Sequence, residues 1–409
     1  MRRNMTEEEK QKRLKMREFL KDISIEGPDG LNNFFKDMMK VAIEEFYQGE
    51  LEEELGYTRY DYRNKESSNS RNGYSSKKLK SSAGEIEVNI PRDRNGEYEP
   101  QIIKKHQNTI GQDLEAKIIS MYAKGMTTSD IESHIDEIYG YQVSDSTITR
   151  ITDKILPIAK EWQNRPLESV YPIVFMDAIH YHVRSEGQIV KKAVYIAIGI
   201  NSFGEKDVIG MWVGENESAK FWLSKLNELK TRGVEDILIA CVDGLTGFAN
   251  AIESVFPQTQ IQQCIIHQIR NSTQFVSYKD IKALMNDLKA VYKAPSEESA
   301  LLNLETFDEN WGKKYPKIAI SWKANWTKLS TYLKYPPEIR TVIYTTNAIE
   351  GYNRQLRKVT KNKAVFPTDD SLLKMLYLAT VDITKKWTTR QRDWGQIISQ
   401  FQIYFEGRI

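Results

Sequence analysis

The sequence of 409 residues has only two cysteines, Cys241 and Cys264, and it lacks long apolar runs. Two cysteines cannot build a disulfide framework. The longest clearly apolar run, Ala193–Ile200, is far shorter than the ~18 residues that cross a bilayer. No apolar segment follows the charged N-terminus, so no signal peptide is predicted. These absences argue against secreted, membrane and zinc-finger-array proteins, and they predict a cytoplasmic protein with reduced thiols.

The net charge is small, but basic residues are concentrated in two stretches of the chain. The net charge is +2, yet residues 351–392 contain ten basic and three acidic side chains. Residues 59–105 contain eleven basic and seven acidic ones. Such stretches suit a polyanion partner, and solvated helix faces are the alternative. The length itself predicts more than one domain.

The N-terminal third is predicted to hold helices and a small ribbon. Helices are expected over 7–20 and 31–55, the second with an apolar stripe that would serve a core or dimerisation and with Gly56 as its stop. An N-terminal helical region would therefore cover 1–58. Residues 59–110 read as a basic arm, with a loop over 59–83 and a β-ribbon over 84–104 around the turn signal Asn95-Gly96.

Residues 111–165 are predicted to form a helix-turn-helix domain. The expected helices are 114–124, 128–139 and 145–156, with Ser144 as a cap and Pro157 as a terminator. The third helix would present Ser146, Thr149 and Arg150, next to Asp145, to a DNA major groove. Packing of three helices without DNA is the alternative.

The following segment predicts a mixed α/β domain. Strands are expected over 173–183, 189–201, 208–214, 236–242 and 260–266, with helices over 217–232 and 247–256. The first three strands suggest antiparallel pairing, and the later crossovers suggest parallel pairing. That order matches the ribonuclease H-like fold. Helical segments are then expected over 279–292, 296–312 and 316–333, closed by Pro336-Pro337, and further helices from Asn347, over 370–384 and from Thr388.

Two aspartates stand in apolar strand faces. Asp177 shares a face with Ile173 and Phe175, and Asp243 ends a similar row in the fourth strand. Neighbouring strands would bring the two carboxylates together, where they would share a proton or bind a divalent ion. A loop cap at Asp177 and a turn at Asp243-Gly244 are the ordinary alternatives.

Glu350 is a third candidate. It opens a helix whose basic side chains share one face, Arg354, Arg357, Lys358 and Lys361, which is suited to phosphate contacts. A carboxylate at the end of such a helix suits a metal-dependent phosphodiester enzyme. The spacing of Asn347 and Glu350 also fits a capping box, which would be purely structural.

These segments resemble the Mutator-type transposases of bacterial insertion sequences, within the wider DDE group. The likeness rests on Tyr171-Pro-Ile-Val-Phe-Met-Asp-Ala-Ile-His180, on residues 230–248, on Gln263-Cys-Ile-Ile-His-Gln-Ile-Arg-Asn-Ser272 and on Tyr344-Thr-Thr-Asn-Ala-Ile-Glu350. The resemblance implies that Asp177, Asp243 and Glu350 form a catalytic triad that binds two Mg²⁺ or Mn²⁺ ions. It implies active-site support by Cys264, His267 and Asn347.

The resemblance also implies an organisation and a reaction. A ribonuclease H-like catalytic domain would cover 166–270 and 341–409, with an all-α insertion at 271–340. The enzyme would bind the terminal inverted repeats of an insertion sequence, nick a strand and transfer the 3′-OH end to target DNA, by copy-out and paste-in. Synapsis of two ends implies at least a homodimer, in a bacterial cytoplasm and nucleoid-associated when bound.

The residues alone leave alternatives open for the activity of the chain, for a zinc site and for a cluster of tryptophans. The chain could be a ribonuclease H-like nuclease or resolvase, or a non-catalytic DNA-binding regulator. Cys264-x-x-His267 supplies only half of a tetrahedral zinc site. The cluster Trp311, Trp322 and Trp326 could be helical core or could stack on an unpaired base.

Overall fold

The computed structural model describes residue 11 and residues 27–61, 65, 67–81, 84–105, 112–139, 142–215, 218–274, 276–344 and 346–409. The helix predicted over 7–20 lies outside these ranges except for residue 11. The chain forms two compact units, residues 1–121 with 128–151, and residues 122–127 with 152–409. None of the described helices is long and apolar enough to span a membrane.

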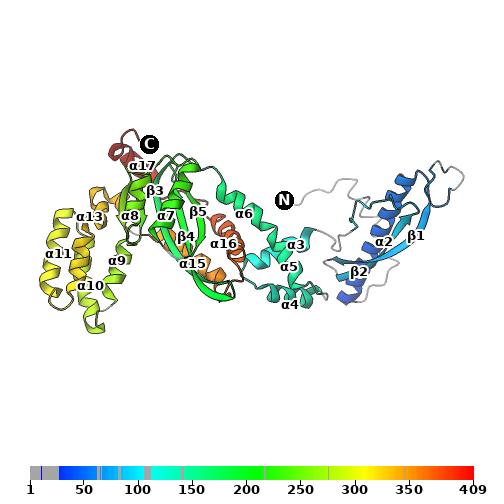
Figure 1. Cartoon of the computed structure of the whole chain (residues 1–409), viewed down its shortest axis with the longest axis horizontal. Coiled ribbons are helices and arrows are strands. Elements are labelled where there is room, and N and C mark those ends of the chain that lie inside the picture. Colours follow the sequence, from blue (N-terminus) through cyan, green and yellow to red (C-terminus); the bar gives the residue numbers. More distant parts are fainter. Residues whose placement is uncertain are drawn as a thin grey trace. The chain divides into compact units, whose positions relative to one another are not determined.

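The first unit contains a long helix against a two-stranded antiparallel ribbon (Figure 1). Helix α2 (Gly27–Leu55) ends at Gly56, which has a positive φ of 73° that glycine adopts easily. Strands β1 (Arg71–Ser81) and β2 (Gly84–Asp93) pair with each other. The shared core contains Ile43, Tyr47, Leu79, Ile86, Val88 and Ile103.

The ribbon lies earlier in the chain than predicted. Strand β2 confirms the alternation around Ile86, but its partner is β1, within the segment predicted as a loop. Strand β1 is rich in Ser and Lys and has few apolar side chains, which hides it from a hydrophobicity pattern. The turn signal Asn95-Gly96 belongs instead to the loop that follows β2. Buried Asn69 fixes the start of this loop, because its Nδ2 donates to Oδ2 of Asp93 over 2.8 Å.

Three helices follow: α3 (Gln112–Ala123), α4 (Thr128–Tyr139) and α5 (Asp145–Asp153). The Ser144 cap is confirmed, since its Oγ accepts from the N–H of Thr147. The end at Pro157 is wrong. A new helix, α6 (Ile155–Asn164), begins before it, and proline is tolerated there because the first turn needs no intrahelical N–H donor.

The second unit is built on a five-stranded mixed sheet in the order β5-β4-β3-β6-β7. Strands β3 (Val170–Ser185), β4 (Gln188–Ile200) and β5 (Lys206–Gly214) pair antiparallel. Strands β6 (Asp236–Val242) and β7 (Gln260–Gln263) add in parallel. The predicted strand order and directions are confirmed, and the second unit is a mixed α/β structure.

Different segments of the chain pack on the two faces of this sheet. Helices α7 (Ala219–Thr231) and α8 (Phe248–Val255) pack on Val174, Met176 and Val242. The alternate residues, Phe175 and Cys241 among them, point to the opposite face. There the Cys241 thiol donates to the carbonyl of Ile343. Residues 177 and 243 follow these alternate positions, so both aspartates belong to the second face.

Helices fill the chain between β7 and residue 343 (Figure 1). They are α9 (Ile265–Thr273), α10 (Tyr278–Tyr292), α11 (Glu297–Trp311), α12 (Pro316–Ala324), α13 (Trp326–Leu329), the short 3₁₀ helix η1 (Thr331–Lys334) and α14 (Pro337–Ile343). The single helix predicted over 316–333 is broken at Asn325. Pro337 opens α14 rather than closing the helical block.

The last helices return to the sheet. Helix α15 (Asn347–Thr360) lies against β3 and β4. The following segment is fixed to β3, because the N–H of Arg184 donates to the carbonyl of Phe366 and the N–H of Phe366 to that of His182. Helix α16 (Asp369–Thr384) starts with a capping box at Thr368, and α17 (Trp394–Tyr404) begins later than the predicted Thr388.

Candidate active site

Asp177 and Asp243 come from neighbouring parallel strands. Met176 is paired with Val242 in the β3–β6 register, so the aspartates occupy the next position of each strand. Both side chains are half-buried. The expectation that the strand order brings them together is therefore supported by the register. Asp177 lies within β3 and caps no loop.

The surroundings of Asp177 favour its protonated form. Burial raises its pKa to about 6, and the negative charges of Asp243 and Glu350 add to the rise. His267 and the N–H of Ala178 act in the opposite direction. Asn353, from α15, donates from Nδ2 to Oδ2 of Asp177 over 2.8 Å. The three carboxylates are thus close enough to influence one another.

Asp243 combines a turn and a charged site. Its Oδ1 accepts from the N–H of Leu245 at 3.2 Å, so the turn predicted at Asp243-Gly244 is present. Burial nevertheless raises the pKa of Asp243, against the opposing effects of that hydrogen bond and of His267. Asp243 therefore accepts the hydrogen bond of a turn and also places a partly buried carboxylate near His267.

Glu350 lies in the first turn of α15, but no capping box forms with Asn347. The N-cap is Thr346, without a side-chain hydrogen bond, and Asn347 is an exposed first helical residue. The Oε1 of Glu350 lies 3.0 Å from Nη1 of Arg270. That contact lacks hydrogen-bond geometry, so this buried oxygen has no hydrogen-bond partner among the described residues. The capping box between Asn347 and Glu350 is therefore absent, and the assignment of Glu350 as a catalytic residue stays a prediction.

Cys264 and His267 begin a helix instead of ending a strand. Strand β7 stops at Gln263, Cys264 is the N-cap of α9, and His267 lies in the first turn. Contact with Cys264, together with the charges of Asp177 and Asp243, raises the pKa of His267 to about 9, although burial lowers it. The Cys264 thiol contacts the Thr346 hydroxyl at 3.2 Å. A protonated His267 offsets the negative charge of the aspartates.

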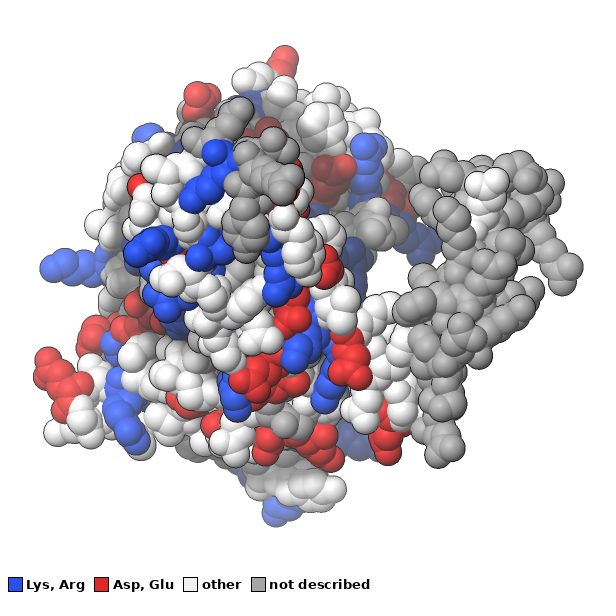
Figure 2. All heavy atoms as spheres, turned by 90° about the vertical axis from the view of Figure 1, so that its right-hand side faces the viewer, with Lys and Arg blue, Asp and Glu red and all other residues white. Residues whose placement is uncertain are grey.

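The basic face of α15 borders this site. Its four cationic side chains are all exposed, and Arg354 and Arg357 line a cavity of about 280 Å³ with Asp177 and Glu350. Figure 2 shows Lys and Arg side chains interspersed with Asp and Glu side chains on the face of the molecule that it draws.

Metal coordination is not preformed by these side chains. In the described part of the chain, no group of three or more His, Cys, Asp or Glu side chains is arranged to hold a metal ion. Arg270 and Asn353 each contact one of the carboxylates. Sequence reasoning missed both residues. They follow His267 and Glu350 by three positions, so the helical i, i+3 spacing was an available signal.

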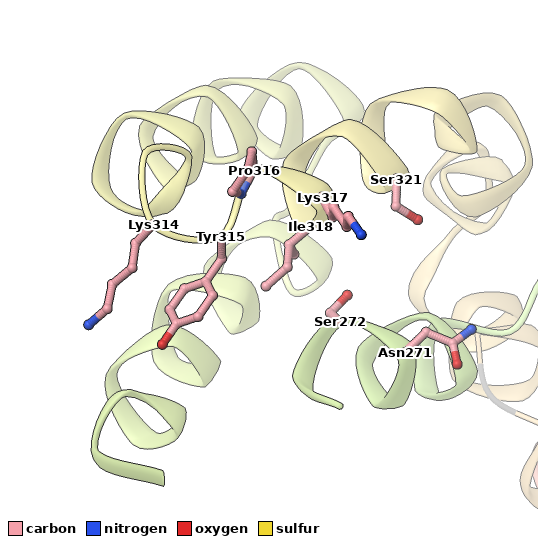
Figure 3. A pocket seen from close by; sticks show the side chains of 8 residues that line it. All are labelled: Asn271, Ser272, Lys314, Tyr315, Pro316, Lys317, Ile318 and Ser321. Carbon is pink, nitrogen blue, oxygen red and sulfur yellow. The ribbon is translucent and has the colours of Figure 1, made fainter. Parts of the chain in front are cut away.

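The remaining predicted residues belong to other elements of the chain. Ser146, Thr149 and Arg150 are exposed on α5 in the first unit. Buried Trp322 donates to Ser272, Trp311 to Asp287 and Trp326 to Glu297, which favours the helical-core interpretation. Figure 3 shows a cavity of about 370 Å³ between α9 and α12, and none of these tryptophans lines it.

Comparisons with known proteins identify the class as transposases. The Mutator family transposase model matches residues 6–390. A probable transposase for an ISRM3-like insertion sequence element from Sinorhizobium fredii is 44% identical, over 93% of this chain and 94% of that protein. The transposase for ISRM3 from Rhizobium meliloti is 43% identical over the same shares.

The chain belongs to the Mutator family of transposases, which confirms the resemblance seen in its motifs. It is a transposase of insertion sequence elements. A Drosophila P element transposase strand transfer complex aligns with 72% of this chain and 81% of its own, at 11% identity and a TM-score of 0.30. That score is too low to support an inference about mechanism.

Proposed function

We propose that this transposase is a metal-dependent enzyme that binds the terminal inverted repeats of its insertion sequence, nicks one strand and transfers the 3′-OH end to target DNA. Asp177, Asp243 and Glu350 are its catalytic and metal-binding carboxylates, within a ribonuclease H-like catalytic domain. The proposal includes a homodimer in a bacterial cytoplasm, nucleoid-associated when bound, and a copy-out and paste-in route.

The observation that carries the proposal is the meeting of three carboxylates from β3, β6 and α15. They come from positions far apart in the sequence, and the charges of two of them raise the pKa of the third. The Oε1 of Glu350 is a buried acceptor that faces the exposed Arg270 guanidinium without forming a hydrogen bond, so a divalent ion could replace that weak partner. Oxygen ligands of this kind fit Mg²⁺ or Mn²⁺, so the residues present fit the implied ions.

Each group has a distinct role in the proposal. Bound divalent ions would supply charge stabilisation at the attacking and leaving oxygens of the phosphodiester. His267 holds a proton beside the aspartates, and Asn353 orients the Asp177 carboxylate. The exposed cations of α15 bind backbone phosphates, while Ser146, Thr149 and Arg150 on α5 read the DNA end.

The test is incubation of the purified protein with labelled terminal-repeat DNA, a plasmid target and Mg²⁺. We expect a nick at the end of the repeat and a covalently joined product. Nicks without joined products would indicate a nuclease or resolvase. Specific binding with neither product would indicate a DNA-binding regulator and overturn the proposal.

A further inference from the structure

A second polar cavity of about 210 Å³ lies at the carboxyl ends of β6 and β7. Asp243 lines it, together with Gln263 and with Asn325 and Lys328 from the junction of α12 and α13. The cavity beside α15 has a different set of lining residues, with Asp177 and Glu350 among them. The two cavities share no lining residue, and each is lined by at least one of the three carboxylates.

The lining of this second cavity has donors without partners. Gln263 is only 7% exposed, and no hydrogen bond to its side-chain amide occurs among the described residues. Lys328 is half-buried and forms no ion pair within the same residues. A buried amide without partners is costly unless a ligand meets it, and the half-buried Lys328 brings a positive charge to the same cavity. An anion with several acceptor oxygens would satisfy both.

Gly244 makes room for that amide. A Cβ at this position would lie 2.6 Å from Nε2 of Gln263, which is closer than real Cβ contacts. The absence of a side chain lets the Gln263 amide reach the cavity beside Asp243. By volume the cavity holds about seven waters at ~30 Å³ each, which is enough for a phosphate and part of its sugar.

We propose that this cavity binds one phosphate–sugar unit of the target DNA strand. The inference rests on the proposed function, because joining requires two polynucleotide strands at the same carboxylates. Arg354 and Arg357 of α15 line the first cavity and suit the phosphates of the transposon-end strand there. Lys328 and Gln263 then contact the other strand, in the cavity that Asp243 lines.

The first experiment compares two reactions of each variant. Nicking is measured on an intact transposon end, and joining on a precut end that carries a free 3′-OH with a plasmid target. We expect Lys328→Ala to lower the ratio of joining to nicking about tenfold, and Lys328→Arg to restore most of it. The matched control is Lys282→Ala, an exposed lysine of α10 that lines neither cavity.

Two outcomes would overturn the proposal. An equal loss of nicking and joining would assign the cavity to the cleaved strand, and no loss of either would mean that it contacts no DNA. If the wild type itself neither nicks nor joins, the proposed function fails instead, so the two failures are distinguishable.

The second measurement does not depend on activity. Both native cysteines are buried, so Thr246→Cys adds an exposed thiol at the cavity rim. A DNA mimic of the joined product carries a tether that ends in an activated disulfide on one backbone phosphate, either in the target strand or in the end strand, so that attack by the new thiol releases a small thiol. We expect a disulfide cross-link to the target strand. Cross-linking mainly to the end strand would contradict the assignment.

Discussion

Arg270 supplies a positive charge next to a proposed metal ligand. Its Nη1 lies 3.0 Å from Oε1 of Glu350, and its side chain is 58% exposed. Because solvent reaches its Arg270 partner, this ion pair is screened and contributes only about 0.2–1 kcal/mol. Arg270 therefore competes weakly with a cation for Glu350 and can move toward a DNA phosphate.

Replacing Arg270 should strengthen metal binding. We expect Arg270→Ala to bind Mn²⁺ about two- to fivefold more tightly in the absence of DNA, because Glu350 loses its competing cation. Titration followed by calorimetry or by the electron paramagnetic resonance signal of free Mn²⁺ measures this directly. The control is Lys282→Ala, which removes an exposed positive charge from α10. Arg340→Ala is unsuitable because the Arg340 side chain donates to three carbonyl groups. Unchanged or weaker Mn²⁺ binding would contradict the competition.

At the residue scale, the sequence predicted the carboxylates better than their neighbours. Alternation in two strands was sufficient to place Asp177 and Asp243 on one face, because strand geometry has a period of two. Arg270 and Asn353 gain their roles only because α9 and α15 converge on those strands. That tertiary arrangement is not encoded in local spacing, which shows only the i, i+3 relation.

Helix α15 connects a proposed metal ligand to a basic surface. Glu350 lies in its first turn, and the exposed cations follow on later turns. Arg357 and Lys358 have no carboxylate partner among the described residues, so their charges are available for phosphates.

Removing two of these charges should change the salt dependence of DNA binding. Each lost phosphate contact lowers the slope of log K against log salt by about 0.9, so Arg357→Ala with Lys358→Ala should lower it by about 1.8. Joining should slow, and preference for the end sequence should stay unchanged. The control is Lys282→Ala with Lys289→Ala on exposed positions of α10. Identical slopes for wild type and the α15 variant would show that this face is merely solvated.

The ends of a helix or strand were predictable where a single feature of the sequence, such as a continuous apolar run, determined both of them. Strand β6 was predicted with its exact limits, since a continuous apolar run between polar residues leaves little choice. The end of β7 was wrong because Ile265 and Ile266 extend its apolar pattern into α9. Strand β1 was missed because its stability comes from pairing with β2 and cover by α2, not from its own apolar content.

The whole molecule separates its predicted tasks between two units. The exposed α5 residues belong mainly to the first unit, and all three carboxylates belong to the second. If this separation holds, recognition of the DNA end and cleavage should respond to different substitutions.

Arg150→Ala should weaken binding to end DNA by about 1–3 kcal/mol and weaken binding to random DNA less, because a base contact carries specificity. Competition binding at one fixed salt concentration with the two DNAs measures the difference. Equal loss on both would mean that Arg150 contacts only phosphate, or that another element reads the sequence.

The order of elements in the second unit was predictable as a whole. Three antiparallel strands followed by two crossovers leave few arrangements, because parallel strands need a connection across one face. The domain boundaries proposed from the sequence stay predictions. Docking of α5 in a major groove needs a DNA partner, so this chain's sequence pattern alone does not predict it.

The central claim is that Asp177, Asp243 and Glu350 act together in DNA strand cleavage and joining. The most direct measurement compares wild type with Asp177→Asn, Asp243→Asn and Glu350→Gln on labelled end DNA at saturating Mg²⁺. Neutral amides keep the shape of each side chain and remove its charge. We predict that each variant loses nicking and joining while binding the DNA end nearly as well as wild type. Substantial cleavage by any one of them would remove that residue from the catalytic set and contradict the account.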